Sequence, residues 1–165
     1  MKNSRIALVV LDKDTSVPVG YTEITCHLIF DVKMDLTLKA RYAAGVHLTD
    51  TPSSMTYASV VGRDTVTMSF LVAALNDLNI LADNIQNAYL NAETKENIFF
   101  YSGDEWRSNR GRIIVIRRAL YRMKSSALMW RNHLSGVIGK ELGFKSSLLD
   151  PYLWLKASII SYGSK

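Results

Sequence analysis

The apolar run NILA, residues 79–82, leads into the segment ADNIQNAYLNA, residues 82–92. The polar pair Asp83 and Asn84 follows the run directly. An apolar run that ends in polar residues, followed by a short turn and an aromatic residue, is typical of a strand that ends at an active site. If Asp83 faces that site, its carboxylate is a ligand for a divalent metal ion. If Asn84 faces it, a neutral amide occupies the position, and the chain has the shape of an enzyme without its chemistry.

A basic stretch forms the second candidate site. No Asp or Glu occurs between Trp106 and Lys140, although the whole chain has a net charge of only +5. This pattern is expected of a protein that binds a polyphosphate; the alternative interpretation is a solvated basic face. The basic residues of the stretch are Arg107, Arg110, Arg112, Arg117, Arg118, Arg122, Lys124, Arg131 and Lys140.

Other classes of protein and site fit less well. His27, His47 and His133 lack metal-ligand spacing, and Cys26 has no second pair to complete a zinc site. A single cysteine excludes an internal disulfide framework and fits a reducing compartment. The N-terminal RIALVVL is too short for a signal peptide, and no segment approaches the roughly 20 apolar residues of a membrane span. We therefore expect an intracellular protein, in cytoplasm or nucleus, without a membrane partner.

The N-terminal part reads as strands and loops. Residues 1–19 predict a short strand and a polar linker, an extension whose attachment to the rest is open. The β-branched run at 22–33 predicts a strand, and LKARYAAGV, at 38–46, predicts the basic return strand of a hairpin. Residues 47–59, with Pro52 and many Ser and Thr residues, predict a loop.

The remaining elements alternate between helices and strands. Asp64 is a candidate cap for a helix over 65–78, whose apolar residues lie nearly all round and so predict burial on several sides. A second helix begins at Ser125 or Ser126, and Gly143 is placed as its left-handed terminator. Strands are predicted at NILADN (79–84), NIFFY (97–101), RIIVIR (112–117) and YLWLK (152–156). The order indicates an α+β fold, an antiparallel sheet with helices packed on one face.

Several segments together resemble the reverse transcriptase of copia-type retrotransposons. They are DVK with KARYAAG, YASVVGRDTVTMSFLVAALN, ADNIQNAYLNA, RALYRMKSSALMW and GFKSSLLDPYLWL, in the family's order and spacing. The resemblance covers residues 20–156, leaves 157–165 as a divergent tail, and implies the fingers and part of the palm of an RNA-directed DNA polymerase. It implies Mg²⁺ as cofactor, and a template-primer of RNA or DNA, a deoxynucleotide and the remainder of the Pol polyprotein as partners.

The resemblance also implies roles for individual residues. Arg41 corresponds to an arginine that contacts the incoming triphosphate, for which a planar donor fork is suited; Lys39 and Lys33 are weaker candidates. Tyr89 corresponds to the aromatic residue that excludes a 2′-hydroxyl, or it is a half-buried core tyrosine. Lys124 is a candidate for the nucleotide, and the candidates for the nucleic-acid backbone are Arg112, Arg117, Arg118 and Arg122.

Two departures concern the metal site. The family's first catalytic Asp lies five residues before its aromatic residue, and counting back from Tyr89 gives Asn84. Asp83 is one residue off, so in a strand it points to the opposite face unless a bulge re-aims it. The family's Tyr-x-Asp-Asp hairpin follows the YLWL strand, and no Asp-Asp pair occurs in these 165 residues.

A third departure concerns the backbone. Arg122 replaces the glycine of Leu-Tyr-Gly-Leu-Lys-Gln and is strained if that turn needs a positive φ. From all three departures we expect a catalytically inactive remnant that holds no productive Mg²⁺ and offers no metal site of its own. The alternative is a non-catalytic nucleic-acid-binding module that uses the basic 106–140 surface.

Overall fold

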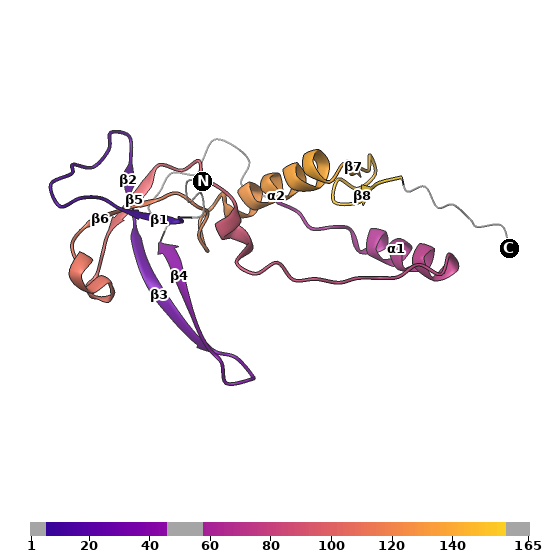
Figure 1. Ribbon diagram of the computed structural model, residues 1–165, viewed down its shortest axis with the longest axis horizontal. Helices are drawn as coiled ribbons and strands as arrows, with labels where there is room; N and C mark the ends of the chain where they lie inside the picture. The colour runs from indigo at the N-terminus through magenta and orange to yellow at the C-terminus, as the bar shows by residue number, and fades with distance from the viewer. Residues whose placement is uncertain (1–5, 46–57, 158–165) are drawn as a thin grey trace. The chain divides into compact units, whose positions relative to one another are not determined.

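The computed structural model describes residues 6–45 and 58–157. They divide into two compact units, shown by element in Figure 1. The first unit contains the chain up to residue 58 and residues 86–133, and the second contains residues 59–85 and the chain from residue 134. Most of the predicted loop at 47–59 and of the C-terminal tail lie outside the described residues.

A four-stranded sheet forms the centre of the first unit, in the order β1-β6-β5-β2. β5 (Ile98–Tyr101) and β6 (Ile113–Ile116) are uninterrupted apolar runs, as expected of central strands covered on both faces. β1 (Leu8–Val10) pairs antiparallel with β6, while β2 (Thr22–Glu23) pairs parallel with β5. The predicted strands at 97–101 and 112–117 are confirmed, and the N-terminal extension contributes β1 to this sheet.

A long hairpin extends from this sheet (Figure 1). It consists of β3 (Thr25–Val32) and β4 (Leu38–Gly45), paired antiparallel from Thr25 opposite Gly45 to Val32 opposite Leu38. The Asp35 side chain accepts a hydrogen bond from the Thr37 N–H at 3.0 Å and so stabilises the turn. The predicted hairpin with its basic return strand is confirmed.

The main core of the first unit lies against the sheet. Its buried members come from β4, β5, β6, Ile24 and the segment after β6: Ile24, Ala44, Ile98, Phe100, Ile114, Ile116, Leu120 and Met123. A smaller cluster of Ala92, Ala119 and Met129 packs with Tyr89, which lies on the 3-10 helix η2 (Ala88–Asn91). A second 3-10 element, η3 (Asp104–Asn109), lies in the loop between β5 and β6.

The helix predicted from Ser125 or Ser126 is confirmed as α2 (Ser126–Gly136), which continues as the π-helix η4 (Val137–Glu141). Gly143 follows with φ +74°, as predicted for its terminator. The Phe144 N–H donates to the Ile138 carbonyl at 3.1 Å, which satisfies a carbonyl that the end of the helix would leave free.

The second unit contains α1 (Arg63–Leu75) and the two-stranded sheet of β7 (Lys145–Ser146) and β8 (Trp154–Leu155). Two predictions about α1 are wrong. Gly62, not Asp64, is the residue before the helix, and Asp64 lies within its first turn without a capping hydrogen bond. Only Ala73 of the helix is buried, and its larger apolar side chains are exposed, so composition alone overstated its burial.

The fold of the described residues is mixed α and β, but it does not contain the single sheet predicted. The described strands form three sheets, and one pairing is parallel, because β2 joins the edge of β5 in the same direction. No α2 residue is among the buried members of the main core, and the packing of helices on one face of the sheet stays a prediction. Within the described ranges, none of the helices has both the length and the apolar character required to cross a bilayer.

Candidate nucleic-acid interface

The segment that carries Asp83 and Asn84 is not a strand. Residues 79–85 follow α1 in the second unit as irregular chain, and both side chains are exposed. The prediction of a strand at NILADN is therefore wrong, and so is the argument that neighbouring side chains must point to opposite faces. An apolar run becomes a strand only where another strand pairs with it, and this run has no such partner among the residues that the structure describes.

The local contacts of these residues determine what they can bind. The Asn84 backbone N–H donates to Oδ1 of Asp83 at 2.7 Å, so the carboxylate is turned onto its own chain. The pair supplies one carboxylate and one neutral amide, whereas a two-metal site needs several converging negative ligands. Among the residues that the structure describes, no three His, Cys, Asp or Glu side chains are grouped closely enough to hold a metal ion. These residues do not fit the pair of Mg²⁺ ions that the resemblance implies.

Tyr89 lies in the first unit and is half-buried. Its ring meets that of Tyr121 edge to face, with centroids 5.3 Å apart, and packs on the cluster of Ala92, Ala119 and Met129. Such an arrangement fixes the ring through apolar contact. The structure thus places Tyr89 as a half-buried, packed tyrosine, and the sugar-selecting role stays a prediction.

The predicted triphosphate contacts all lie on the hairpin. Arg41, on β4, forms an ion pair with Asp31 of β3 at 3.7 Å, and both side chains are partly exposed. Lys39 faces Asp31 across the ladder, and Lys33 follows the end of β3 as an exposed residue. An exposed pair at this distance is weak, so the Arg41 guanidinium remains available to a stronger anion.

The five basic residues predicted after β5 do not share one environment. Arg118 donates from Nη1 to the Asn91 carbonyl at 2.8 Å, and its Nη2 lies 3.8 Å from Glu93. Its side chain is only 11% exposed. Arg118 therefore holds the end of η2 and the segment after it in place. The nucleic-acid contact predicted for Arg118 requires instead a side chain at the surface.

Arg117 and Arg122 are exposed, as a phosphate contact requires. Arg122 has φ +70°, so the turn does need the conformation that favours glycine, and the predicted backbone strain is confirmed. Lys124 is half-buried and has a partner within the protein. Arg112 is half-buried, and its Nε has no hydrogen-bond partner among the described residues.

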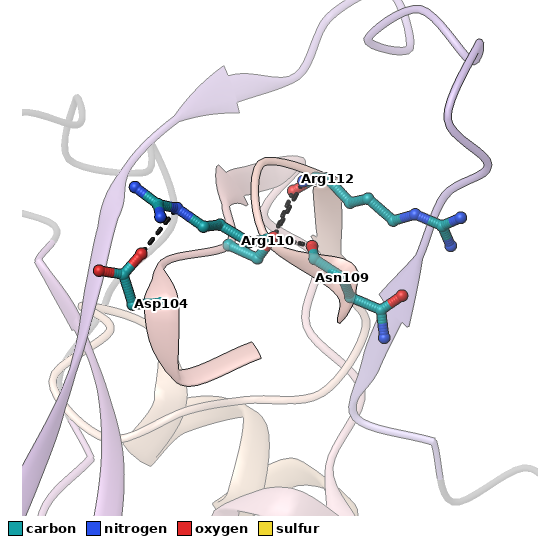
Figure 2. A network of polar contacts seen from close by, with 5 residues as sticks. Asp104, Asn109, Arg110 and Arg112 are labelled. Carbon is teal, nitrogen blue, oxygen red and sulfur yellow. Dashed lines mark hydrogen bonds and ion pairs between the residues drawn. The ribbon is translucent and has the colours of Figure 1, made fainter. Parts of the chain in front are cut away.

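Sequence analysis missed how the loop between β5 and β6 is organised (Figure 2). Nε of Arg110 forms an ion pair with Asp104 at 2.6 Å, so an acid just before the acid-free stretch neutralises one of its arginines. The buried Ser102 hydroxyl donates to the Asn109 carbonyl and accepts from the Arg112 N–H at 2.9 Å, and the Arg112 carbonyl lies 3.2 Å from the same oxygen. The figure shows the Arg110 and Arg112 side chains pointing in opposite directions from this loop.

A second unpredicted network joins the hairpin to η3. The Tyr42 hydroxyl donates to Oε1 of Glu105 at 2.8 Å and accepts from Nε1–H of Trp106 at 3.0 Å. Burial raises the pKa of Tyr42 to about 12. Burial likewise raises the pKa of Cys26 to about 12, so this thiol is protonated at neutral pH and is not a reactive nucleophile. No local pattern could have joined positions 63 and 64 residues apart.

Comparison with known proteins gives one informative match. The chain is 27% identical over 124 residues to the Transposon Ty1-BL Gag-Pol polyprotein of Saccharomyces cerevisiae. The match covers 74% of this chain and 7% of that polyprotein. No family model and no solved structure matches. The chain is thus similar to a small part of a transposon polyprotein.

Proposed function

We propose that this chain is a reverse transcriptase-like segment of a copia-type retrotransposon polyprotein that has lost polymerase chemistry. The observation that carries this proposal is the ordered set of segments from DVK to YLWL, which resembles that family. The similarity to a transposon Gag-Pol polyprotein, over 124 residues, supports the same origin. Because the chain spans 7% of that polyprotein, further parts of a Pol polyprotein are the partners we propose.

The chemical reason for lost activity lies at Asn84. Template-directed synthesis by two metal ions needs negative ligands that hold both cations against the attacking and leaving oxygens. An amide offers a carbonyl oxygen without charge, and each ~1.4 kcal/mol of lost transition-state stabilisation slows the reaction about tenfold. Asp83, with its carboxylate bonded to the Asn84 N–H, does not replace that charge.

Primer extension tests this proposal. The chain is incubated with a primed RNA template, deoxynucleotides and Mg²⁺, beside the Asn84→Asp variant and an active reverse transcriptase. We expect no added nucleotide from the unaltered chain. Template-directed addition that stops with EDTA would contradict the proposal. Extension by Asn84→Asp alone would identify Asn84 as the cause.

A second candidate function is nucleic-acid binding without catalysis, and exposed arginines of the first unit favour it. Within the described chain, the guanidinium groups of Arg107, Arg117 and Arg122 form no hydrogen bond or ion pair. Guanidinium groups that neutralise phosphates displace the counterions condensed on the nucleic acid. The affinity for nucleic acid therefore falls steeply as the salt concentration rises. Anisotropy of a labelled primer-template at increasing salt tests this function, and absence of binding at low salt would exclude it.

A further inference from the structure

The backbone of β3 has one edge that faces away from β4. In an antiparallel pair, successive residues direct their N–H and C=O groups alternately toward the partner strand and away from it. The Lys33 N–H donates to the Thr37 carbonyl, toward β4, at 3.0 Å. The Ile24 N–H donates to the Phe99 carbonyl, away from β4, at 2.9 Å. Odd-numbered residues of β3 therefore bond to β4, and even-numbered residues direct their backbone groups outward.

The outer edge of β3 is free over its second half. The outward backbone groups of Leu28, Phe30 and Val32 have no partner among the residues that the structure describes. β3 contains no Pro, Gly or Lys, and its pairing with β4 runs residue by residue without a bulge. These are the features with which proteins protect an exposed edge. Phe30 and Val32 are also 75% and 57% exposed. This edge is therefore a template for a further strand.

The outer edge of β4 is protected in two ways. At its end, the Ala44 N–H donates to the Tyr121 carbonyl at 3.2 Å, so the segment after β6 covers the edge there. Nearer the turn, β4 carries the basic residues Lys39 and Arg41. If two copies of the chain paired through β4, these like charges would meet across the junction and destabilise the pairing. Pairing between copies is therefore favoured at β3.

The sequence of β3 is complementary to itself in one antiparallel register. With Ile29 on a twofold axis, Leu28 lies opposite Phe30 of a second copy, and their outward backbone groups exchange both hydrogen bonds. In the same register, His27 lies opposite Asp31 of the second copy, close enough for an imidazole N–H to donate to the carboxylate. A slip by two residues, which keeps the backbone hydrogen bonds, places His27 or Asp31 opposite Ile29 instead.

Both members of the polar pair are accessible. The Asp31 carboxylate lies 3.7 Å from Arg41, and the two side chains are partly exposed, so this ion pair within the hairpin is weak. His27 is exposed, and its cross-strand neighbour Ala43 offers no polar side chain. A second copy thus supplies each residue with a partner that the hairpin itself lacks.

We propose that the chain associates with a second copy through the outer edge of β3, which joins the two hairpins into one antiparallel sheet. The same edge is used in both copies, so the assembly closes at a dimer. Because only strand edges and the adjoining side chains are covered, the interface is small, and we expect micromolar affinity. Neither a polymerase origin nor nucleic acid enters this association, so its test is separate from those of the proposed function.

Sedimentation velocity of the full chain and three variants, from about 1 to 100 μM without nucleic acid, tests the edge. Phe30→Pro removes an outward N–H that the monomer leaves unbonded, and proline is tolerated at such edge positions. Phe30→Ala removes the same ring but retains the N–H. Ala40→Pro is the matched control, because Ala40 lies opposite Phe30 and directs its N–H outward from β4. Circular dichroism confirms that each variant is folded.

We expect the unaltered chain and Ala40→Pro to dimerise alike, and Phe30→Pro to stay monomeric. Phe30→Ala should dimerise about tenfold more weakly, because two side-chain pairs are lost and the backbone hydrogen bonds remain. An unaltered chain that is monomeric at about 100 μM would overturn the inference. Dimerisation of Phe30→Pro, or a monomeric Ala40→Pro, would do the same.

A charge exchange tests the register without altering the backbone. His27→Asp places like charges opposite each other twice in the dimer and should weaken it about tenfold. Adding Asp31→His restores the complementary pairs and should recover the affinity. Two independent structural effects would instead add, and the double variant would then dimerise no better than His27→Asp. That result would overturn the inference even if Phe30→Pro failed to fold.

Discussion

The Asp150 carboxylate accepts a hydrogen bond from the Thr65 hydroxyl at 2.7 Å, although the two residues lie 85 positions apart. The same Oδ2 accepts from the Gly62 N–H at 3.0 Å. Asp150 thus accepts hydrogen bonds from groups at the start of α1, which is the capping role predicted for Asp64. The helix dipole also favours a negative charge at this end of a helix. The loop before β8 and the start of α1 are held together by this one side chain.

Replacing Asp150 should loosen the start of α1. With Asp150→Ala we expect hydrogen exchange of the first-turn amides to speed up about fivefold, because a lost cap exposes them. Asp64→Ala is the control and should leave this exchange nearly unchanged. Equal effects of the two substitutions would mean that Asp150 does not cap the helix.

The contribution of Asp150 should depend on pH. Hydrogen bonds from Thr65, Tyr152 and Gly62 hold the pKa of its carboxyl below the usual value of 3.8. A lowered folded-state pKa stabilises the fold above the unfolded-state value, and the gain is lost as pH falls through the folded-state pKa. Urea denaturation should separate Asp150→Asn from the unaltered chain at pH 7 more than at pH 3. A constant difference would contradict the assignment.

Arg122→Gly should stabilise the first unit. A non-glycine residue at φ +70° carries a strain of about 1 kcal/mol, which glycine removes. Arg117→Gly is the matched control, since it removes the same charge at an exposed residue whose φ is not positive. Thermal denaturation should show opposite shifts for the two variants, and a loss of stability in both would show that the turn is not strained.

Arg118 should matter for stability and Arg117 for binding. Arg118→Ala leaves the Asn91 carbonyl without its charged donor and should cost about 1.5–3 kcal/mol. Arg117→Ala should change stability by less than about 0.5 kcal/mol. It should also reduce the salt slope of nucleic-acid binding by about 1. Chemical denaturation and salt titration measure the two effects, and reversed roles would contradict the structure.

Tyr42→Phe should remove the hydrogen bonds that join the hairpin to η3. The substitution leaves the Trp106 Nε1–H and the Glu105 carboxylate without their shared partner and should cost about 1 kcal/mol. Because the pKa of Tyr42 is raised to about 12, its stabilisation is complete below the unfolded-state pKa of about 10 and is lost as pH rises toward 12. The difference in phenolate absorbance between the two chains, followed through alkaline titration, should therefore appear near pH 12. Its appearance near pH 10 would exclude this network.

Local patterns predicted local structure well. β5, β6, the hairpin and the ending at Gly143 follow from short apolar runs, turn residues and one glycine, whose effects lie within a few residues. The predictions of a strand at 79–84 and of a buried α1 were wrong because distant parts of the chain determine which partners a segment pairs with and packs against. The hydrogen bonds of Thr65 to Asp150 and of Tyr42 to Glu105 could not be predicted for the same reason.

Some features of the candidate site could likewise be predicted from the sequence, and others could not. The strain at Arg122 could be anticipated, because a glycine-dependent turn is a property of one residue. The internal role of Arg118 and the neutralisation of Arg110 by Asp104 could not, because charge counting treats all basic residues of a stretch alike.

The salt dependence of primer-template binding, measured beside primer extension in the same samples, tests the central claim most directly. The account predicts binding that weakens as salt rises, with each of the three free arginines contributing about −0.9 to the log-log slope, and a primer that stays unextended with Mg²⁺. Templated extension, or no binding at 50 mM salt or below, would contradict it.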